Sequence, residues 1–171
     1  MAPTQTETQV LTRAAVDVLA RTGRKQDVAG LLTENTLLKA LTDVQRAALV
    51  RGGTWATYPE VTVVSTQGSA VDAVLFIVKG RAKAEISPPA RTEYRAVVNF
   101  LTPGDDIGLL SLVDGGPHSA TVTAMEELQA LSVPLKTMSA YLDAHPEWNK
   151  TLAEIAVARL RESGQWLQAL I

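Results

Sequence analysis

The alternation of hydrophobic and polar positions divides the chain into a helical start, a β-rich middle and a helical end. From Thr8 onward, apolar residues recur at the spacing of a helix that ends near Gly23. In a second helical stretch, Thr42 and Gln45 have the spacing of a capping box. The apolar positions of the first helix are Val10, Leu11, Ala14, Ala15, Val18 and Leu19. The residues of the second helix expected to face a core are Val44, Ala47, Ala48, Leu49 and Val50.

After Gly52 and Gly53 the pattern changes to short segments rich in β-branched and aromatic residues. They are separated by the turn sequences PE, QGS, KG, SPP, PGDD and DGGP. Such spacing predicts an antiparallel sandwich or barrel. Residues 135–144 then read as a helix, and Pro146 suits the first turn of a long helix that follows. The segments expected to be strands read TWATY, VTVV, AVLFIV, RAKAEI, YRAVVNFL, SATVTA and LQALSV.

The predicted fold class is α+β, with an antiparallel, jelly-roll-like β-roll flanked by N-terminal helices and a long C-terminal helix. The expected organisation is a helical extension in residues 1–34, a β-roll in 35–137 and C-terminal helices in 138–171.

The stretch from Ile107 to Ala124, IGLLSLVDGGPHSATVTA, has the layout of a strand, a one-turn helix and a second strand around something small. A helix N-terminus attracts an anion through its free backbone N–H groups, and Gly108 permits a close approach of the backbone. A phosphate also needs positive charge, for which His118 is the candidate. The layout therefore indicates a phosphate pocket with little cationic support.

Several segments together resemble the cyclic-nucleotide-binding domain family over residues 35–162. NTLLKAL followed by TDVQ resembles its lead-in helix, and AVLFIVKGRAKAEI resembles its central strand pair, with Gly80 as the turn glycine. FLTPGDDIGLLSLVDGGPHSATVTA resembles its phosphate-binding cassette, and AHPEWNKTLAEIAVARLRE resembles the helix that follows the roll in the catabolite-activator class.

The resemblance implies a ligand site that departs from the family at its two charged positions. Leu109 stands where the family has the glutamate for the ribose hydroxyl, and His118 stands where it has the arginine for the cyclic phosphate. The candidate ligand-binding residues of this degenerate cassette are Ile107, Gly108, Leu109, Leu110, His118, Ser119 and Ala120.

Two interpretations of these departures stay open. His118 could be held protonated beside a phosphate, or it could be a partly exposed residue with no ligand. Leu109 could fill the pocket or leave it open and apolar, and Ser119 keeps a hydroxyl suited to a phosphate oxygen. Loss of two charge-assisted hydrogen bonds, worth about 1.5–3 kcal/mol each, would weaken binding on the order of a hundred- to ten-thousand-fold. We therefore expect no bound cofactor, with a cyclic nucleotide the disfavoured exception.

Composition and charge argue against several classes of function. The 171 residues have a formal net charge of −2 and no cysteine, and there is no basic stripe of the kind that nucleic-acid binding requires. His118 and His145 form no H-x-H pair for a metal, and no G-x-S-x-G motif is present. We expect no catalytic residues, no metal, no nucleic acid and no membrane contact, and a cytoplasmic protein. The weakest alternative is an uncharacterised enzyme.

A heptad pattern runs along the C-terminal helix. Its spacing of four and three residues is typical of a dimer seam, although a helix lying on its own roll also needs an apolar stripe. The seam residues are Ala153, Val157, Leu160, Gly164, Leu167 and Ile171. Gly164 lowers helix stability, so an end near Ser163 is an alternative.

The sequence predicts a regulatory or scaffold protein that forms a homodimer through the C-terminal helix and contacts other proteins. A helix-turn-helix domain, which follows the helix in transcription factors of the class, is not expected after Ile171. The alternative function is a sensor of a cyclic nucleotide or another anion with altered specificity.

Overall fold

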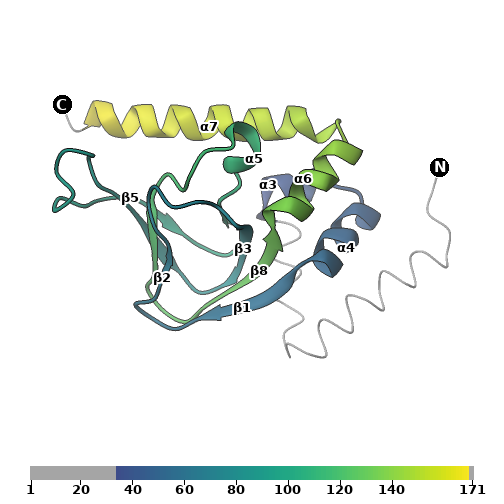
Figure 1. Cartoon of the computed structure of the whole chain (residues 1–171), viewed down its shortest axis with the longest axis horizontal. Coiled ribbons are helices and arrows are strands. Elements are labelled where there is room, and N and C mark those ends of the chain that lie inside the picture. Colours follow the sequence, from purple (N-terminus) through teal and green to yellow (C-terminus); the bar gives the residue numbers. More distant parts are fainter. Residues whose placement is uncertain (1–33, 170–171) are drawn as a thin grey trace.

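The computed structural model describes residues 34–169. Helices cover one side and one end of two antiparallel sheets, and α7 runs above the sheets from the end of α6 toward the side of β5 (Figure 1). The elements, in chain order, are α3 (Thr36–Ala40), α4 (Asp43–Gly52), β1 (Thr54–Tyr58), β2 (Val63–Ser65), β3 (Ala73–Lys79), β4 (Ala82–Ile86), β5 (Ala96–Leu101), β6 (Asp106–Ile107), α5 (Ser111–Asp114), β7 (Thr121–Ala124), β8 (Leu128–Pro134), α6 (Leu135–Ala144) and α7 (Trp148–Ala169).

Two four-stranded sheets form the β-roll. One has the strand order β1-β8-β3-β6 and the other β2-β7-β4-β5, and every pair is antiparallel. This arrangement confirms the predicted α+β class with an antiparallel roll. The β3–β4 turn requires a glycine at position 80, because its φ is +87° and a β-carbon there would lie 2.3 Å from the Glu127 carbonyl oxygen.

Strand β3 separates two apolar layers, which explains why its sequence is almost continuously hydrophobic. Successive side chains of a strand point to opposite faces. Phe76 faces the helices and joins the core formed with α3, α4, α6 and α7, whereas Leu75 and Ile77 face the interior of the roll. Because both faces are covered, each of these residues is buried.

The capping box predicted from the sequence begins helix α4. The Thr42 hydroxyl accepts a hydrogen bond from the Gln45 amide, and the Gln45 side chain accepts one from the Thr42 amide. Leu49 is fully buried against the helix-side core, as expected. The expectation for Val44 is wrong, because it lies in the first turn on the outer face and 43% of it is exposed.

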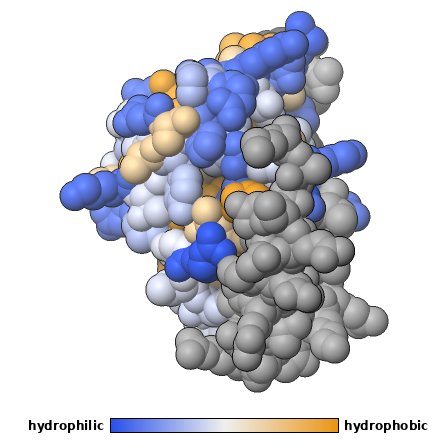
Figure 2. All heavy atoms as spheres, turned by 90° about the vertical axis from the view of Figure 1, so that its right-hand side faces the viewer, coloured by the Kyte–Doolittle hydropathy of each residue, from blue (hydrophilic) through white to orange (hydrophobic). Residues whose placement is uncertain are grey.

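The helical side of the molecule presents no broad apolar surface among the described residues that Figure 2 leaves visible. Hydrophilic residues dominate there, and hydrophobic ones form small separate groups. None of the helices in residues 34–169 has the length and hydropathy needed to cross a bilayer. The helix predicted between Thr8 and Gly23, and the extension 1–34 except its last residue, lie outside the described residues.

Candidate functional site

The stretch predicted to enclose a small group folds as expected, with β6, the one-turn helix α5 and β7 in succession. Gly108 lies at the turn out of β6 with a φ of +89°. A β-carbon on it would lie 3.0 Å from both the Ala73 carbonyl oxygen and a methyl group of Val71. The close approach that glycine permits here is therefore to the protein's own strand β3.

Backbone amides at the start of α5 are already engaged in hydrogen bonds. The N–H groups of Ser111, Leu112 and Val113 donate to the carbonyl oxygens three residues earlier, at 3.2, 3.1 and 2.9 Å. The Ser111 hydroxyl donates to the Gly116 carbonyl oxygen, which closes the turn after the helix. The expected row of free amides is thus reduced, because tight i→i+3 bonds satisfy donors that an anion would otherwise use.

Leu109 is part of the core and does not face the roll. It is 1% exposed and belongs to the cluster that contains Leu38 of α3, Met138 of α6 and Trp148 of α7. This corrects the expectation that its side chain faces a ribose position, since it points toward the helices. Its role in the structure is packing, and Leu110 beside it is half-buried.

His118 is half-buried and is held by the β2–β3 loop. Its amide donates to the Ser69 carbonyl oxygen, and its own carbonyl oxygen accepts from the Gly68 amide. The Cε1 atom of the ring lies 3.6 Å from the place of a β-carbon on Gly108. Burial lowers the pKa of His118, and the nearby Asp72 carboxylate opposes that shift. The neutral imidazole is therefore the form favoured at neutral pH.

The remaining predicted ligand residues do not converge on one cavity. Ile107 is buried in the interior of the roll and Ala120 packs against the same cluster, whereas Ser119 is exposed. Gly108 and His118 are the two cassette residues that the structure brings together. Among residues 34–169 no three His, Cys, Asp or Glu side chains are grouped as metal ligands would be.

A buried charge network lies immediately before the cassette, and the sequence reasoning missed it. Asp106 pairs with Phe76 in the sheet and so shares its helix-facing side. The Nη2 atom of Arg159 lies 2.7 Å from each Asp106 carboxylate oxygen. Asn35 donates to Asp106 at 3.3 Å and to the Gly104 carbonyl oxygen at 2.9 Å, and it caps α3 by accepting from the Leu38 amide.

The sequence carried only a weak signal for this network. The turn sequence PGDD predicts that Asp105 and Asp106 are both turn residues that bond to the local backbone. That interpretation holds for Asp105, which accepts from the Thr102 amide at 2.8 Å, but it is wrong for Asp106. The alternation of side chains along a strand could have indicated the position of Asp106. If Ile107 faces the interior of the roll, the neighbouring Asp106 must point to the opposite face of the sheet, toward the helices.

One buried hydroxyl in the roll has no partner among the described residues. Ser65 of β2 pairs with Val122 of β7, whose side chain is in the interior cluster, so Ser65 lies on the same interior face. Its Oγ atom is buried and makes no hydrogen bond. An unpaired buried polar group costs about 1–3 kcal/mol, so it marks a place where a polar ligand atom would be favourable.

Helix α7 uses one apolar stripe for the core and leaves the predicted seam outside. Leu152 and Ile155 are buried against the roll's helices, whereas Val157 and Leu160 are 47% and 74% exposed. The seam residue Ala153 is also exposed. Gly164 and Leu167 fall in the last turns of α7, which continues past Ser163 to Ala169, and Ile171 lies outside the described residues.

The sequence matches the family described as "Cyclic nucleotide-binding domain" over residues 55–145. That range begins in β1 and ends just after α6, so it contains the roll except its first residue, together with the cassette. It covers more than half of the chain.

Proteins similar to this chain include transcription regulators. The "CRP-like cAMP-activated global transcriptional regulator" of Mycobacterium tuberculosis is 28% identical over 156 residues, which are 91% of this chain and 62% of that protein. The N-terminal domain of a transcriptional regulator from Streptomyces coelicolor A3(2) is 27% identical, with a TM-score of 0.62 over 80% of this chain and 94% of that one. The catabolite activator protein of Thermus thermophilus is 23% identical, with a TM-score of 0.68 over 80% of this chain and 63% of that one.

Proposed function

The chain belongs to the cyclic nucleotide-binding domain family, and from this premise we propose that it is a regulatory domain that acts through protein–protein contacts and takes up cyclic nucleotides weakly or not at all. It has no catalytic role in this proposal. Nucleic acid is not among the proposed partners, because the formal net charge is −2 and the pI is about 5.7. The relatives' activities belong to longer proteins, of which this chain spans 62% in the Mycobacterium tuberculosis case.

The observation that carries the proposal is the absence of a permanent cation at the described cassette. His118 is the basic side chain nearest to Gly108, its pKa is lowered by burial, and the charge that acts on it is the carboxylate of Asp72. An incoming phosphate would therefore meet a neutral ring and a negative neighbour. A permanently charged guanidinium fork, which matches phosphate oxygens with two hydrogen bonds, is what such a site otherwise uses.

The packing of Leu109 supports the same conclusion. Its side chain is committed to the helix-side core, so the position after Gly108 offers no acceptor for a sugar hydroxyl. Each missing charge-assisted hydrogen bond is worth about 1.5–3 kcal/mol. Two of them reduce affinity on the order of a hundred- to ten-thousand-fold, which places a micromolar site in the submillimolar to millimolar range.

Calorimetric titration of the full chain with cAMP and with cGMP tests this proposal. We expect no saturable binding with a dissociation constant below about 100 μM. Saturable binding tighter than about 10 μM, lost in His118→Ala or Ser119→Ala, would overturn it. His118→Arg restores a permanent cation without disturbing the core and should raise affinity for both ligands, with His118→Ala as its matched control.

A homodimer through α7 is part of the proposal. Val157 and Leu160 are exposed on the side of α7 away from Leu152 and Ile155, so an apolar stripe remains after the helix has packed on its own domain. Two-fold dimers are the commonest homo-oligomers, and a stripe with heptad spacing matches a second copy of itself.

A second candidate function is a sensor of a small molecule with altered specificity, and the hydroxyl of Ser65 favours it. A ligand with one polar atom and an apolar body would satisfy that group and contact the interior cluster. A thermal-shift screen with the full chain tests this candidate. A compound that raises the melting temperature of the wild type but not of Ser65→Ala supports it, whereas an equal effect on both proteins contradicts it.

A further inference from the structure

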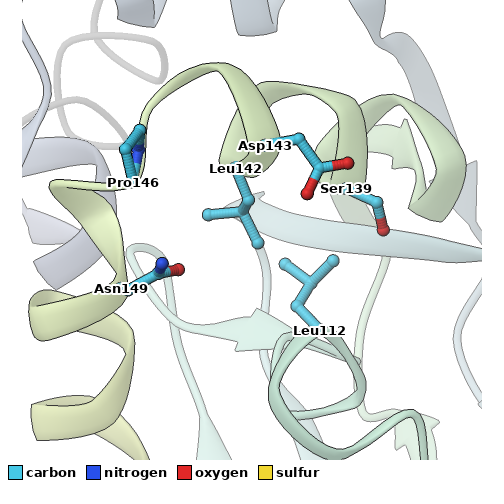
Figure 3. A pocket seen from close by; sticks show the side chains of 6 residues that line it. All are labelled: Leu112, Ser139, Leu142, Asp143, Pro146 and Asn149. Atoms are coloured by element: carbon cyan, nitrogen blue, oxygen red, sulfur yellow. The ribbon is translucent and has the colours of Figure 1, made fainter.

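A hollow of about 310 Å³ lies outside the roll, where α5, α6 and the start of α7 meet. In Figure 3 the side chains of Leu112 and Leu142 point toward one another from α5 and α6 and form its apolar floor. Its rim is polar. The residues that line it are Leu112, Ser139, Leu142, Asp143, Pro146 and Asn149. None of the six is a lysine or an arginine, so the hollow carries a net negative charge.

The position of Asp143 strengthens that negative charge. Asp143 lies in the last turn of α6, and that turn contains no basic residue. The C-terminal end of a helix has a partial negative charge, so a carboxylate there is unfavourable in the free protein. Asp143 is exposed and forms no ion pair and no side-chain hydrogen bond with another residue of the range 34–169, so both carboxylate oxygens are open to solvent and to a partner.

Two further polar side chains line the same hollow. Ser139 lies one turn before Asp143 on the same face of α6, whereas Asn149 lies on α7, on the other side of Leu142 (Figure 3). Their side chains likewise make no hydrogen bond with other described residues. All three side chains are exposed, so a partner's side chain can reach them from solvent.

We propose that this hollow receives the side chain of an arginine carried by a partner protein. The aliphatic stem would lie on Leu112, Leu142 and Pro146, as long cationic side chains do on apolar surfaces. The guanidinium has five donors in a rigid fork and can pair with the Asp143 carboxylate while it also donates to the neighbouring Ser139 hydroxyl. Lysine has one compact ammonium group and cannot form the two parallel hydrogen bonds that a guanidinium forms with a carboxylate.

The location would link such a partner to the cassette. Leu112 belongs to α5, the helix between the two cassette strands, whereas Ser139 and Asp143 belong to α6. An inserted arginine would therefore bridge the cassette helix and the α6–α7 junction. This inference rests on the proposed role in protein contacts, but it does not depend on whether cyclic nucleotides bind.

The test is a titration of the isotope-labelled full chain with N-acetyl-arginine methylamide, followed in ¹H–¹⁵N correlation spectra. We expect saturable, millimolar binding with shifts confined to residues 109–115 and 139–150, including the Asn149 side-chain amide. Asp143→Asn should weaken it by about tenfold or more. Asp114→Asn, on α5 outside the hollow, should leave it unchanged. N-acetyl-norleucine methylamide, which has a similar stem without the cation, should not bind.

Several outcomes would overturn the proposal. These are the absence of saturation, equal binding of the norleucine compound, equal binding of the corresponding lysine compound, tighter binding of free arginine than of the capped residue, or no effect of Asp143→Asn. The melting temperature of Asp143→Asn should equal or exceed that of the wild type, because a carboxylate at a helix C-terminus is unfavourable. A loss of binding in this variant can therefore be distinguished from a loss of folding. A negative result in this titration would not change the result expected from calorimetry with cyclic nucleotides. The two experiments therefore test the two proposals independently.

Discussion

Arg159 of α7 forms an ion pair with Asp106 of β6, 53 residues earlier in the chain, with contacts of 2.7 Å to both carboxylate oxygens. The Asp106 side chain is 4% exposed and that of Arg159 is 33% exposed. The pair therefore lies at the boundary between the helices and the roll. Because Ile107 and Gly108 follow directly, it ties the middle of α7 to the strand that begins the cassette.

Asp106→Asn should destabilise the protein by about 2–3 kcal/mol. The amide keeps the size of the side chain but loses a charge-assisted interaction, which contributes about 1.5–3 kcal/mol when one partner is charged. Arg159 is partly exposed and can be hydrated, so the loss stays below that of a fully buried pair. Urea denaturation followed by circular dichroism measures the change.

Asp72→Asn is the matched control, because Asp72 is exposed and forms no ion pair with another described residue. A double-mutant cycle with Arg159→Gln isolates the pairwise contribution from other contacts of Arg159. A coupling free energy near zero would show that the ion pair does not hold α7 to the roll.

Leu109→Ala should cost about 3 kcal/mol. Leu109 is fully buried in the helix-side core, and truncation of a buried leucine loses both transfer free energy and the contacts around the cavity. The same denaturation experiment measures it.

Val113→Ala serves as the comparison for Leu109, since Val113 is 50% exposed in the adjacent helix α5. A change below about 0.5 kcal/mol is expected there. If Leu109→Ala were equally mild, Leu109 would not be a packing residue and a ligand-facing role would be open again.

The sequence was a good guide to elements whose pattern is local. Helix α6 spans Leu135–Ala144 as predicted, and β1 spans Thr54–Tyr58 as predicted. The capping box of α4 has the predicted partners, because a cap depends on residues three positions apart. Strand β6 was expected only from the layout of the stretch Ile107–Ala124, since its two residues carry too little periodicity to indicate a strand by themselves.

The faces on which side chains lie were harder to predict, because they depend on contacts distant in the sequence. The direction of Leu109 is decided by the turn at Gly108 and by α3, α6 and α7 packing over it. In α7, both the core stripe with Leu152 and Ile155 and the heptad stripe with Leu160 satisfy helical spacing. Only the folded domain distinguishes the stripe that is used internally from the one that is left exposed.

The stability of the protein should fall below about pH 6.5 through His118. Burial lowers its pKa in the folded state below the ordinary value of 6.5. Between the two values the unfolded chain binds more protons, so the stabilising contribution is present above pH 6.5 and is lost as the pH falls through the folded pKa. His118→Gln should flatten this part of the profile of unfolding free energy against pH.

Asp72 provides the internal check on that assignment, because its carboxylate raises the pKa that burial lowers. Asp72→Asn should lower the pKa of His118 further, measured from the shift of the Cε1 proton in an NMR titration. Only two histidines need to be resolved. A pKa of His118 above 6.5 in the wild type would contradict the burial argument and revive a phosphate-bound, protonated imidazole.

The exposed stripe of α7 predicts that Leu160→Glu converts a homodimer into a monomer. Leu160 is 74% exposed and Val157 47% exposed, and a carboxylate at the centre of a self-matching seam faces its own copy across the two-fold axis. Sedimentation equilibrium should give a mass near twice 18.3 kDa for the wild type and 18.3 kDa for the variant. Ala158→Glu places the same charge on an exposed residue of the same helix outside the seam, and it should keep the dimer. A dimer mass that survives Leu160→Glu would assign the interface to another surface, and a wild-type monomer would remove the dimer from the proposal.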